Sequence, residues 1–169
     1  MEAIRVLVTG GTFDKEYNEL TGRLFFRRSQ VPEMLRLGRS GVPVRIKTLF
    51  MMDSLGMGPR HRRAILRECL KSRERRIVVT HGTDTMAETA RVLGPSIAGK
   101  TVVLTGAMVP YKFGSSDGLF NLGSALAFAQ ALPPGVYIAM NGRHFRWDNV
   151  RKNRSRGKFE PARAAKGPS

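Results

Sequence analysis

The strongest constraint on the fold of this chain comes from two short turns that are rich in glycine and threonine. Each turn follows a run of β-branched residues. The turn at 9–12 (TGGT) follows the run at 4–8, and the turn at 81–85 (HGTDT) follows the run at 77–80, about seventy residues later. Such runs predict buried parallel strands, whose carboxyl ends form the edge where open α/β sheets build their sites. Glycine permits a sharp turn beside a ligand, and an adjacent base can make a threonine hydroxyl nucleophilic. The two turns together therefore predict an active site at one sheet edge.

Apolar runs and helical patterns alternate along the chain, as is typical of βαβ units. Strands are expected at 4–9, 43–50, 77–80, 102–106 and 136–141. Helices are expected at 59–73, from Asp84 onward, and from Asp117 onward with that residue as the cap. The segment 10–30 has scattered glycines and no clear period, so we expect a hairpin or a mobile lid. The sequence thus predicts a single three-layer α/β domain over 1–160 with a mainly parallel sheet, and a frayed tail at 161–169.

The chain is strongly basic. Lys and Arg number 29 against 13 Asp and Glu, which gives a formal net charge of +16. Such a surface attracts polyanions in a salt-sensitive way. The basic residues are dispersed along the sequence and do not alternate with aromatic residues as in a base-stacking platform. Composition therefore favours a solvated basic face, and leaves weak non-specific nucleic-acid binding as an alternative.

Other features narrow the class of protein. The lone cysteine, Cys69, lies in a helical pattern and is expected in the core. No stretch approaches the length of a membrane span and no signal-peptide pattern precedes the first strand, so a cytoplasmic location is expected. The 3 histidines are scattered, and no set of residues has metal-ligand spacing. We therefore expect neither a metal nor a cofactor.

Several segments resemble the bacterial-type L-asparaginases, the asparaginase and glutaminase amidohydrolases. That family carries TGGT near its N-terminus and HGTDT about seventy residues on, as this chain does. Further segments agree in order and approximate spacing: 53–57 (DSLGM), similar to the substrate-binding loop, 105–122 (TGAMVP…DGLFNL) and 148–153 (DNVRKN). The resemblance runs from about Arg5 to Phe159 and implies the fold of the family's N-terminal domain. The chain is similar to the short-chain form of the family, which lacks the second domain that members usually carry.

The resemblance implies catalytic roles for five residues in the two turns and elsewhere in the chain. Thr12 is the nucleophile that attacks the side-chain amide carbonyl and forms an acyl-enzyme. Tyr17 corresponds to the family's loop tyrosine, with a simple surface tyrosine as the alternative. Thr83 is the second catalytic threonine, held by Asp84 and Lys152. A lysine packed against a hydroxyl in a dry cleft can accept or relay a proton. The alternatives are a helix cap for Asp84 and a solvated surface residue for Lys152.

The resemblance also implies how the substrate is held. Its substrate-binding set is Asp53, Ser54, Gly82, Thr83 and Asp84. Ser54 is expected to contact the α-carboxylate and Asp84 the α-ammonium, while backbone N–H groups of both turns supply the oxyanion hole. The chain departs from the family pattern at Leu55, where many members carry glutamine or serine. A leucine cannot hydrogen-bond the ammonium, so weak substrate affinity is expected.

These implications predict an L-asparaginase that hydrolyses L-asparagine to L-aspartate and ammonia. Because the family's second domain is absent from this chain, we expect a partner subunit to close the site in a homo-oligomer, a dimer or a tetramer. Two alternatives stay open: an asparaginase-like subunit of a tRNA-dependent amidotransferase, and a basic nucleic-acid-binding module with a relic site. Ammonia release from free asparagine separates the first interpretation from the other two.

Overall fold

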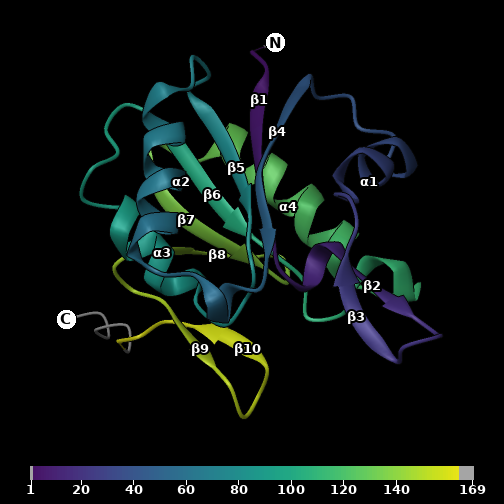
Figure 1. The fold of residues 1–169 in the computed structure, drawn as a ribbon. Coiled ribbons are helices and arrows are strands. Elements are labelled where there is room, and N and C mark those ends of the chain that lie inside the picture. Colours follow the sequence, from purple (N-terminus) through teal and green to yellow (C-terminus); the bar gives the residue numbers. More distant parts are fainter. Residues whose placement is uncertain (1, 164–169) are drawn as a thin grey trace.

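The five predicted strands and one that was not predicted, β8, form a single six-stranded sheet with the order β4-β1-β5-β6-β7-β8. The computed structural model describes residues 2–163 and pairs the strands from β4 to β7 in parallel, with β8 antiparallel at the edge (Figure 1). The strands are β1 (Ile4–Gly10), β4 (Val44–Met52), β5 (Arg76–Thr80), β6 (Thr101–Thr105), β7 (Gly135–Met140) and β8 (Arg143–Arg146). The predicted α/β class and mainly parallel sheet are therefore confirmed.

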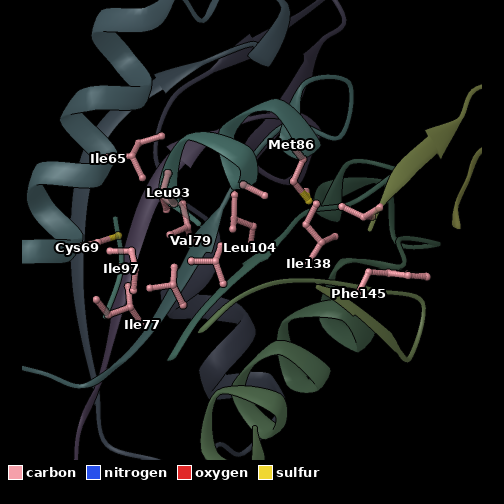
Figure 2. Packing of buried hydrophobic residues seen from close by; sticks show 14 of the residues in the cluster. Ile65, Cys69, Ile77, Val79, Met86, Leu93, Ile97, Leu104, Ile138 and Phe145 are labelled. Atoms are coloured by element: carbon pink, nitrogen blue, oxygen red, sulfur yellow. The ribbon is translucent and has the colours of Figure 1, made fainter. Parts of the chain in front are cut away.

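Helices cover both faces of this sheet and bury its four inner strands, whereas much of the edge strands β4 and β8 stays exposed. On one face lie α2 (Pro59–Lys71) and α3 (Met86–Leu93), and on the other α1 (Val31–Leu37) and α4 (Gly118–Ala131) (Figure 1). Successive side chains of a strand point to opposite faces, so Leu7 joins the first core and Val6 the second. Figure 2 shows the first core, in which Cys69 packs beside Ile65 and Ile77. Cys69 is fully buried, which confirms its place as a core residue, and this burial raises the pKa of its thiol to about 12.

The strand order places a topological switch point between β1 and β5. The chain leaves β1 toward β4 by way of α1, and it leaves β5 toward β6 by way of α3 on the opposite face. Connections that diverge in this way open a crevice at the carboxyl ends of the two strands. Both threonine-bearing turns leave the sheet at this point.

Two hairpins flank the same edge of the sheet (Figure 1). The first, β2 (Lys15–Asn18) and β3 (Arg23–Phe26), confirms the expectation of a hairpin within 10–30. The second pairs β9 (Arg151–Asn153) with β10 (Lys158–Glu160). Three single-turn 3₁₀ helices lie close by: η1 (Thr12–Asp14), η2 (Ser54–Gly56) and η3 (Tyr111–Phe113).

One predicted helix start needs correction, and the cap predicted for another helix has a different role. Helix α3 begins at Met86 with Thr85 at its N-cap, because the carboxylate of Asp84 binds a lysine rather than the first turn. Asp117 does occupy the N-cap of α4, but its side chain makes no capping bond and accepts the backbone N–H of Met108 and Val109 instead. The carboxylate therefore fixes the loop after β6.

The ends of the chain add little to the site. Of the tail predicted to fray at 161–169, residues 161–163 are exposed, and the Arg163 N–H donates to Asn149 Oδ1 at 2.9 Å. The remainder of that tail, 164–169, lies outside the described residues. Within residues 2–163, none of the helices combines the length and the apolar composition that crossing a bilayer requires.

Candidate active site

The two threonine-bearing turns touch through their glycines. Gly11 has a φ of 79°, and a Cβ on it would lie 2.4 Å from Gly82 N and 2.5 Å from Gly82 Cα. No side chain fits in that space, so only glycine permits the two backbones to approach this closely. Thr12 and Thr83, the residues that follow these glycines, are thereby held on adjacent loops. The structure confirms that the switch point brings both turns together.

The loop after β4 closes against the second turn. A Cβ on Gly82 would lie 2.6 Å from both Cβ and Oγ of Ser54, so glycine is again required for contact. The Thr85 hydroxyl donates to the Ser54 carbonyl at 2.9 Å, and Ser54 is 1% exposed. The carboxyl ends of β1, β4 and β5 therefore meet at Ser54, Gly11 and Gly82.

Lys152 reaches this edge from the β9–β10 hairpin and joins the second turn. Its Nζ donates to Thr83 Oγ1 at 2.8 Å and to Asp84 Oδ1 at 2.8 Å. The lysine side chain is only 11% exposed, whereas that of Asp84 is 36% exposed. Thr83 itself is buried. The structure therefore brings Thr83, Asp84 and Lys152 together, although the lysine lies nearly seventy residues away in the sequence.

His81 fixes the shape of the second turn. Its Nδ1 lies 2.7 Å from the Gly82 carbonyl and its Nε2 lies 2.8 Å from the Thr89 hydroxyl. Burial lowers the pKa of His81 to about 4, so the imidazole is neutral near pH 7. A carbonyl only accepts, so Nδ1 carries the proton and Nε2 accepts from Thr89. Both ring nitrogens are thus engaged, which makes His81 a structural residue of the turn.

The remaining candidates lie at the margin of this assembly. Asp53 pairs with Lys15 and accepts the Leu55 N–H at 3.1 Å, and the hydrogen bond from Lys15 lowers its pKa. Tyr17 is 53% exposed on β2, and its hydroxyl lies 4.0 Å from where a Cβ on Gly22 would stand. Among the described residues, the Tyr17 hydroxyl has no hydrogen-bond partner. The structure thus brings Ser54, Gly82, Thr83, Asp84 and Lys152 together and holds Thr12 next to the contact between Gly11 and Gly82. The exposed Tyr17 side chain makes no hydrogen bond to these residues.

One of the backbone groups expected in the oxyanion hole is already used. The Gly11 N–H donates to the Met52 carbonyl at 2.9 Å, which ties β1 to the end of β4. It cannot also bind an oxyanion. The first turn therefore leaves the N–H of Thr12 for that role, beside those of Gly82 and Thr83.

Asp14, which no sequence motif singled out, is buried two residues after Thr12. It is 0% exposed, and its Oδ1 accepts the Gln30 N–H at 2.7 Å and the Ser29 hydroxyl at 3.2 Å. These bonds join the two ends of the segment that carries the β2–β3 hairpin. Its other oxygen, Oδ2, is buried without a hydrogen-bond partner. Burial, only partly offset by those two bonds, raises the pKa of Asp14 to about 6.

This raised pKa predicts a distinct pH dependence of stability. Between about pH 4 and pH 6 the folded protein holds a proton on Asp14 that the unfolded chain has lost. The contribution of Asp14 to the free energy of unfolding therefore falls as the pH rises. Asp14→Asn removes the buried charge, and its free energy of unfolding relative to wild type should rise by roughly 3 kcal/mol between pH 4 and pH 8. Chemical denaturation at both pH values measures this change. Asp148→Asn, an exposed carboxylate, is the control; an equal change in both variants would contradict the argument.

A metal centre is not among the features of this edge. Within residues 2–163, no group of three or more His, Cys, Asp or Glu side chains is arranged to hold a metal ion. The chemistry available is that of hydroxyls, a lysine, a carboxylate and backbone N–H groups. Such a set is suited to acyl transfer.

Comparison with known proteins identifies relatives of the same fold. The chain is 32% identical to the L-asparaginase of Thermococcus kodakarensis over 139 residues, which cover 79% of this chain and 42% of that protein. The solved structure of that enzyme matches with a TM-score of 0.83 at 31% identity, covering 94% of this chain and 51% of the other. The probable cytoplasmic L-asparaginase of Campylobacter jejuni matches with a TM-score of 0.72 at 29% identity, covering 90% and 48%.

A second kind of relative is similar at the same level. A glutamyl-tRNA(Gln) amidotransferase subunit of Pyrococcus abyssi is 33% identical over 150 residues, which cover 82% of this chain and 33% of that protein. The chain thus spans from about a third to about half the length of the relatives it matches. The model of the family described as "Asparaginase, N-terminal" matches residues 3–160. By this match, which covers nearly the whole chain, the protein belongs to the asparaginase family.

Proposed function

We propose that this chain hydrolyses the side-chain amide of L-asparagine to L-aspartate and ammonia. The observation that carries the proposal is the pair of 2.8 Å hydrogen bonds from Lys152 to Thr83 and Asp84, placed beside the turn that holds Thr12. A hydroxyl in contact with a sequestered lysine and a carboxylate is the arrangement that proton transfer in acyl chemistry requires. The names of the relatives support asparagine as the substrate.

The proposed reaction begins with attack of Thr12 Oγ on the amide carbonyl carbon. The oxyanion that forms is held by the N–H groups of Thr12, Gly82 and Thr83. The Thr12 proton passes by way of Thr83 and Lys152 to the leaving nitrogen. The C–N bond breaks, ammonia departs, and an ester of Thr12 remains. Water then attacks the ester carbonyl, releases L-aspartate and restores the threonine hydroxyl.

The substrate is held by groups around this centre. Ser54 and the backbone of Gly82 face the α-carboxylate, while the partly exposed Asp84 takes the α-ammonium as a charge-assisted hydrogen bond. Asp53 acts on this loop through its contact with Leu55 N–H. Tyr17 remains a candidate proton acceptor for Thr12, a role that requires the β2–β3 hairpin to fold over the first turn.

The direct test is ammonia release from L-asparagine and from L-glutamine, measured in parallel with purified protein. Turnover of asparagine supports the proposal, and its absence at every concentration of substrate contradicts it. The same preparation, analysed by sedimentation velocity, tests the further proposal that the active species is a homo-oligomer. A cytoplasmic location is proposed from the name of the Campylobacter relative.

Leu55 predicts weak substrate binding that a single change improves. The side chain lies directly after Ser54, is 66% exposed, and offers no hydrogen-bond acceptor. In Leu55→Gln the amide oxygen can accept from the substrate ammonium, so KM should fall by about tenfold with little change in kcat. Steady-state kinetics with asparagine measure both constants. Leu70→Gln, an exposed leucine on α2, is the matched control, and a micromolar KM in the unmodified protein would overturn the premise.

A second function is favoured by one of the relatives and by the charge of the chain. The P. abyssi relative is part of a glutamyl-tRNA(Gln) amidotransferase, and the net charge of +16 on this chain suits a polyanionic partner. In such a role the chain would release ammonia from an amide donor for a tRNA-bound acceptor. Under this alternative, ammonia release requires tRNA. Under the first proposal it proceeds without tRNA and changes little across the physiological range of salt.

A further inference from the structure

The exposed face of helix α2 carries a row of arginines. Arg60, Arg63 and Arg67 lie three and four residues apart, so they stand on one side of the helix, about one turn from each other. Lys71, the last residue of α2, and Arg73, two residues after the end of the helix, extend the row. All of these side chains are exposed. The basic band, defined as these five residues, therefore gathers charges that are dispersed along the sequence.

The charges of the band have no acidic partners among the described residues. Glu68, the acidic residue nearest in the sequence, pairs with Lys47 of β4 at 2.6 Å. Glu74 is buried and pairs with Arg5 at 3.0 Å and with Arg45 at 3.5 Å. The nearby carboxylates are thus already occupied by other cations. The band keeps its full positive charge for a partner outside the chain.

Two hollows in the protein surface lie beside α2, and residues of the basic band line both of them. One, of about 390 Å³, is lined by Arg60, Arg63, Arg67 and two leucines. The other, of about 510 Å³, lies against the edge strand β4 and is lined by Arg5, Arg45, Lys47, Glu68, Lys71, Ser72 and Arg73. Guanidinium groups bind phosphate oxygens through two parallel N–H bonds. A surface with hollows lined by guanidinium groups can therefore bind several consecutive phosphate groups of one polymer.

We propose that the basic band binds the phosphodiester backbone of a nucleic acid without reading its sequence. Regular spacing of cations along about 16 Å of helix matches a linear polyanion, which repeats its charge along a line. An anionic membrane fits less well, because an interfacial helix must insert an apolar face. The apolar face of α2, with Ile65 and Cys69, is fully buried in the core (Figure 2). Leu70 is the one large apolar residue of α2 that is exposed beside the band.

The position of the band relative to the candidate active site allows the two to act independently. Helix α2 begins at Pro59, shortly after the loop that carries Ser54, and runs from there toward the opposite end of the sheet (Figure 1). A strand bound along it would leave the crevice at the two threonines uncovered. Nucleic-acid binding and the proposed hydrolysis are therefore separable by mutation.

The test compares two variants with the same change in net charge. One is Arg60→Gln/Arg63→Gln/Arg67→Gln, and its control is Arg36→Gln/Arg154→Gln/Arg156→Gln, which neutralises exposed arginines on other surfaces. Binding is measured by fluorescence anisotropy with a labelled RNA of mixed sequence, of about 20 nucleotides, across a salt series. We expect the band variant to bind at least about tenfold more weakly at low salt, with a salt slope reduced by about two. The control should retain most of the affinity and the slope.

Three outcomes would overturn the proposal. Equal losses in both triple variants would show that net charge alone attracts the RNA. If the wild-type chain did not bind RNA at low salt, the proposed nucleic-acid partner would be wrong. Tighter binding to phosphatidylserine vesicles than to RNA, lost in the band variant, would assign the band to a membrane surface. If the triple variant fails to fold by circular dichroism, Arg67→Glu against Arg154→Glu makes the same comparison with single exposed changes.

Discussion

Thr12→Ala and Thr83→Ala are each expected to lower the turnover of asparagine by about a thousandfold or more while leaving the fold intact. The first removes the proposed nucleophile and the second removes the hydroxyl that contacts Lys152 at 2.8 Å. Groups that act as one unit fail when either is lost, so the double variant should be little worse than either single one. Ammonia release under substrate saturation measures kcat for all three.

The controls separate chemistry from packing. Thr48→Ala, on the exposed part of β4, removes a threonine from another strand and should leave turnover unchanged. Thermal unfolding of each variant reports whether the alanine has loosened the turn. Near-wild-type turnover in folded Thr83→Ala would show that the two-threonine mechanism is wrong, whereas the same result for Thr12→Ala would assign the nucleophile elsewhere.

The two threonine-bearing turns were predictable because their signal is local. A β-branched run followed by glycine and threonine defines a strand end, and parallel strands deliver their ends to one edge. The structure adds the contact itself: Gly11 and Gly82 meet backbone to backbone, a fact that depends on strand order and not on either segment alone. The same applies to Ser54, whose burial against Gly82 follows from the pairing of β4 with β1.

Other features carry no comparable signal in the sequence. The β9–β10 hairpin is short and polar, so neither the period nor the composition of its strands distinguishes it from a solvated loop. Asp14 is a single charged residue after a phenylalanine, and its burial depends on Ser29 and Gln30 returning past it. Asp84 has the sequence position of a helix cap, because it precedes a segment with helical apolar spacing. In the structure its carboxylate instead accepts a hydrogen bond from Lys152 of the β9–β10 hairpin. In each case a tertiary contact outweighs the local preference.

Replacing Lys152 should separate the two properties that a lysine brings to this site, its charge and its ability to exchange a proton. Lys152→Met removes both, and we expect kcat to fall by about 10²- to 10⁴-fold, the usual contribution of a general acid or base. The loss of the ion pair with Asp84 should cost at most about 1 kcal/mol of stability, because the carboxylate remains partly exposed to water. Urea denaturation and steady-state kinetics measure the two effects independently.

Lys152→Arg is the informative partner of that variant. A guanidinium keeps the positive charge and can still pair with Asp84, but it does not release its proton in the range of pH where proteins are folded. If proton transfer through Lys152 is the essential step, the arginine variant should unfold at the wild-type urea concentration and yet lose kcat nearly as severely as the methionine variant. Recovery of wild-type kcat in Lys152→Arg would contradict the proton relay. It would show that the 2.8 Å contact with Thr83 serves only to place a positive charge beside the turn.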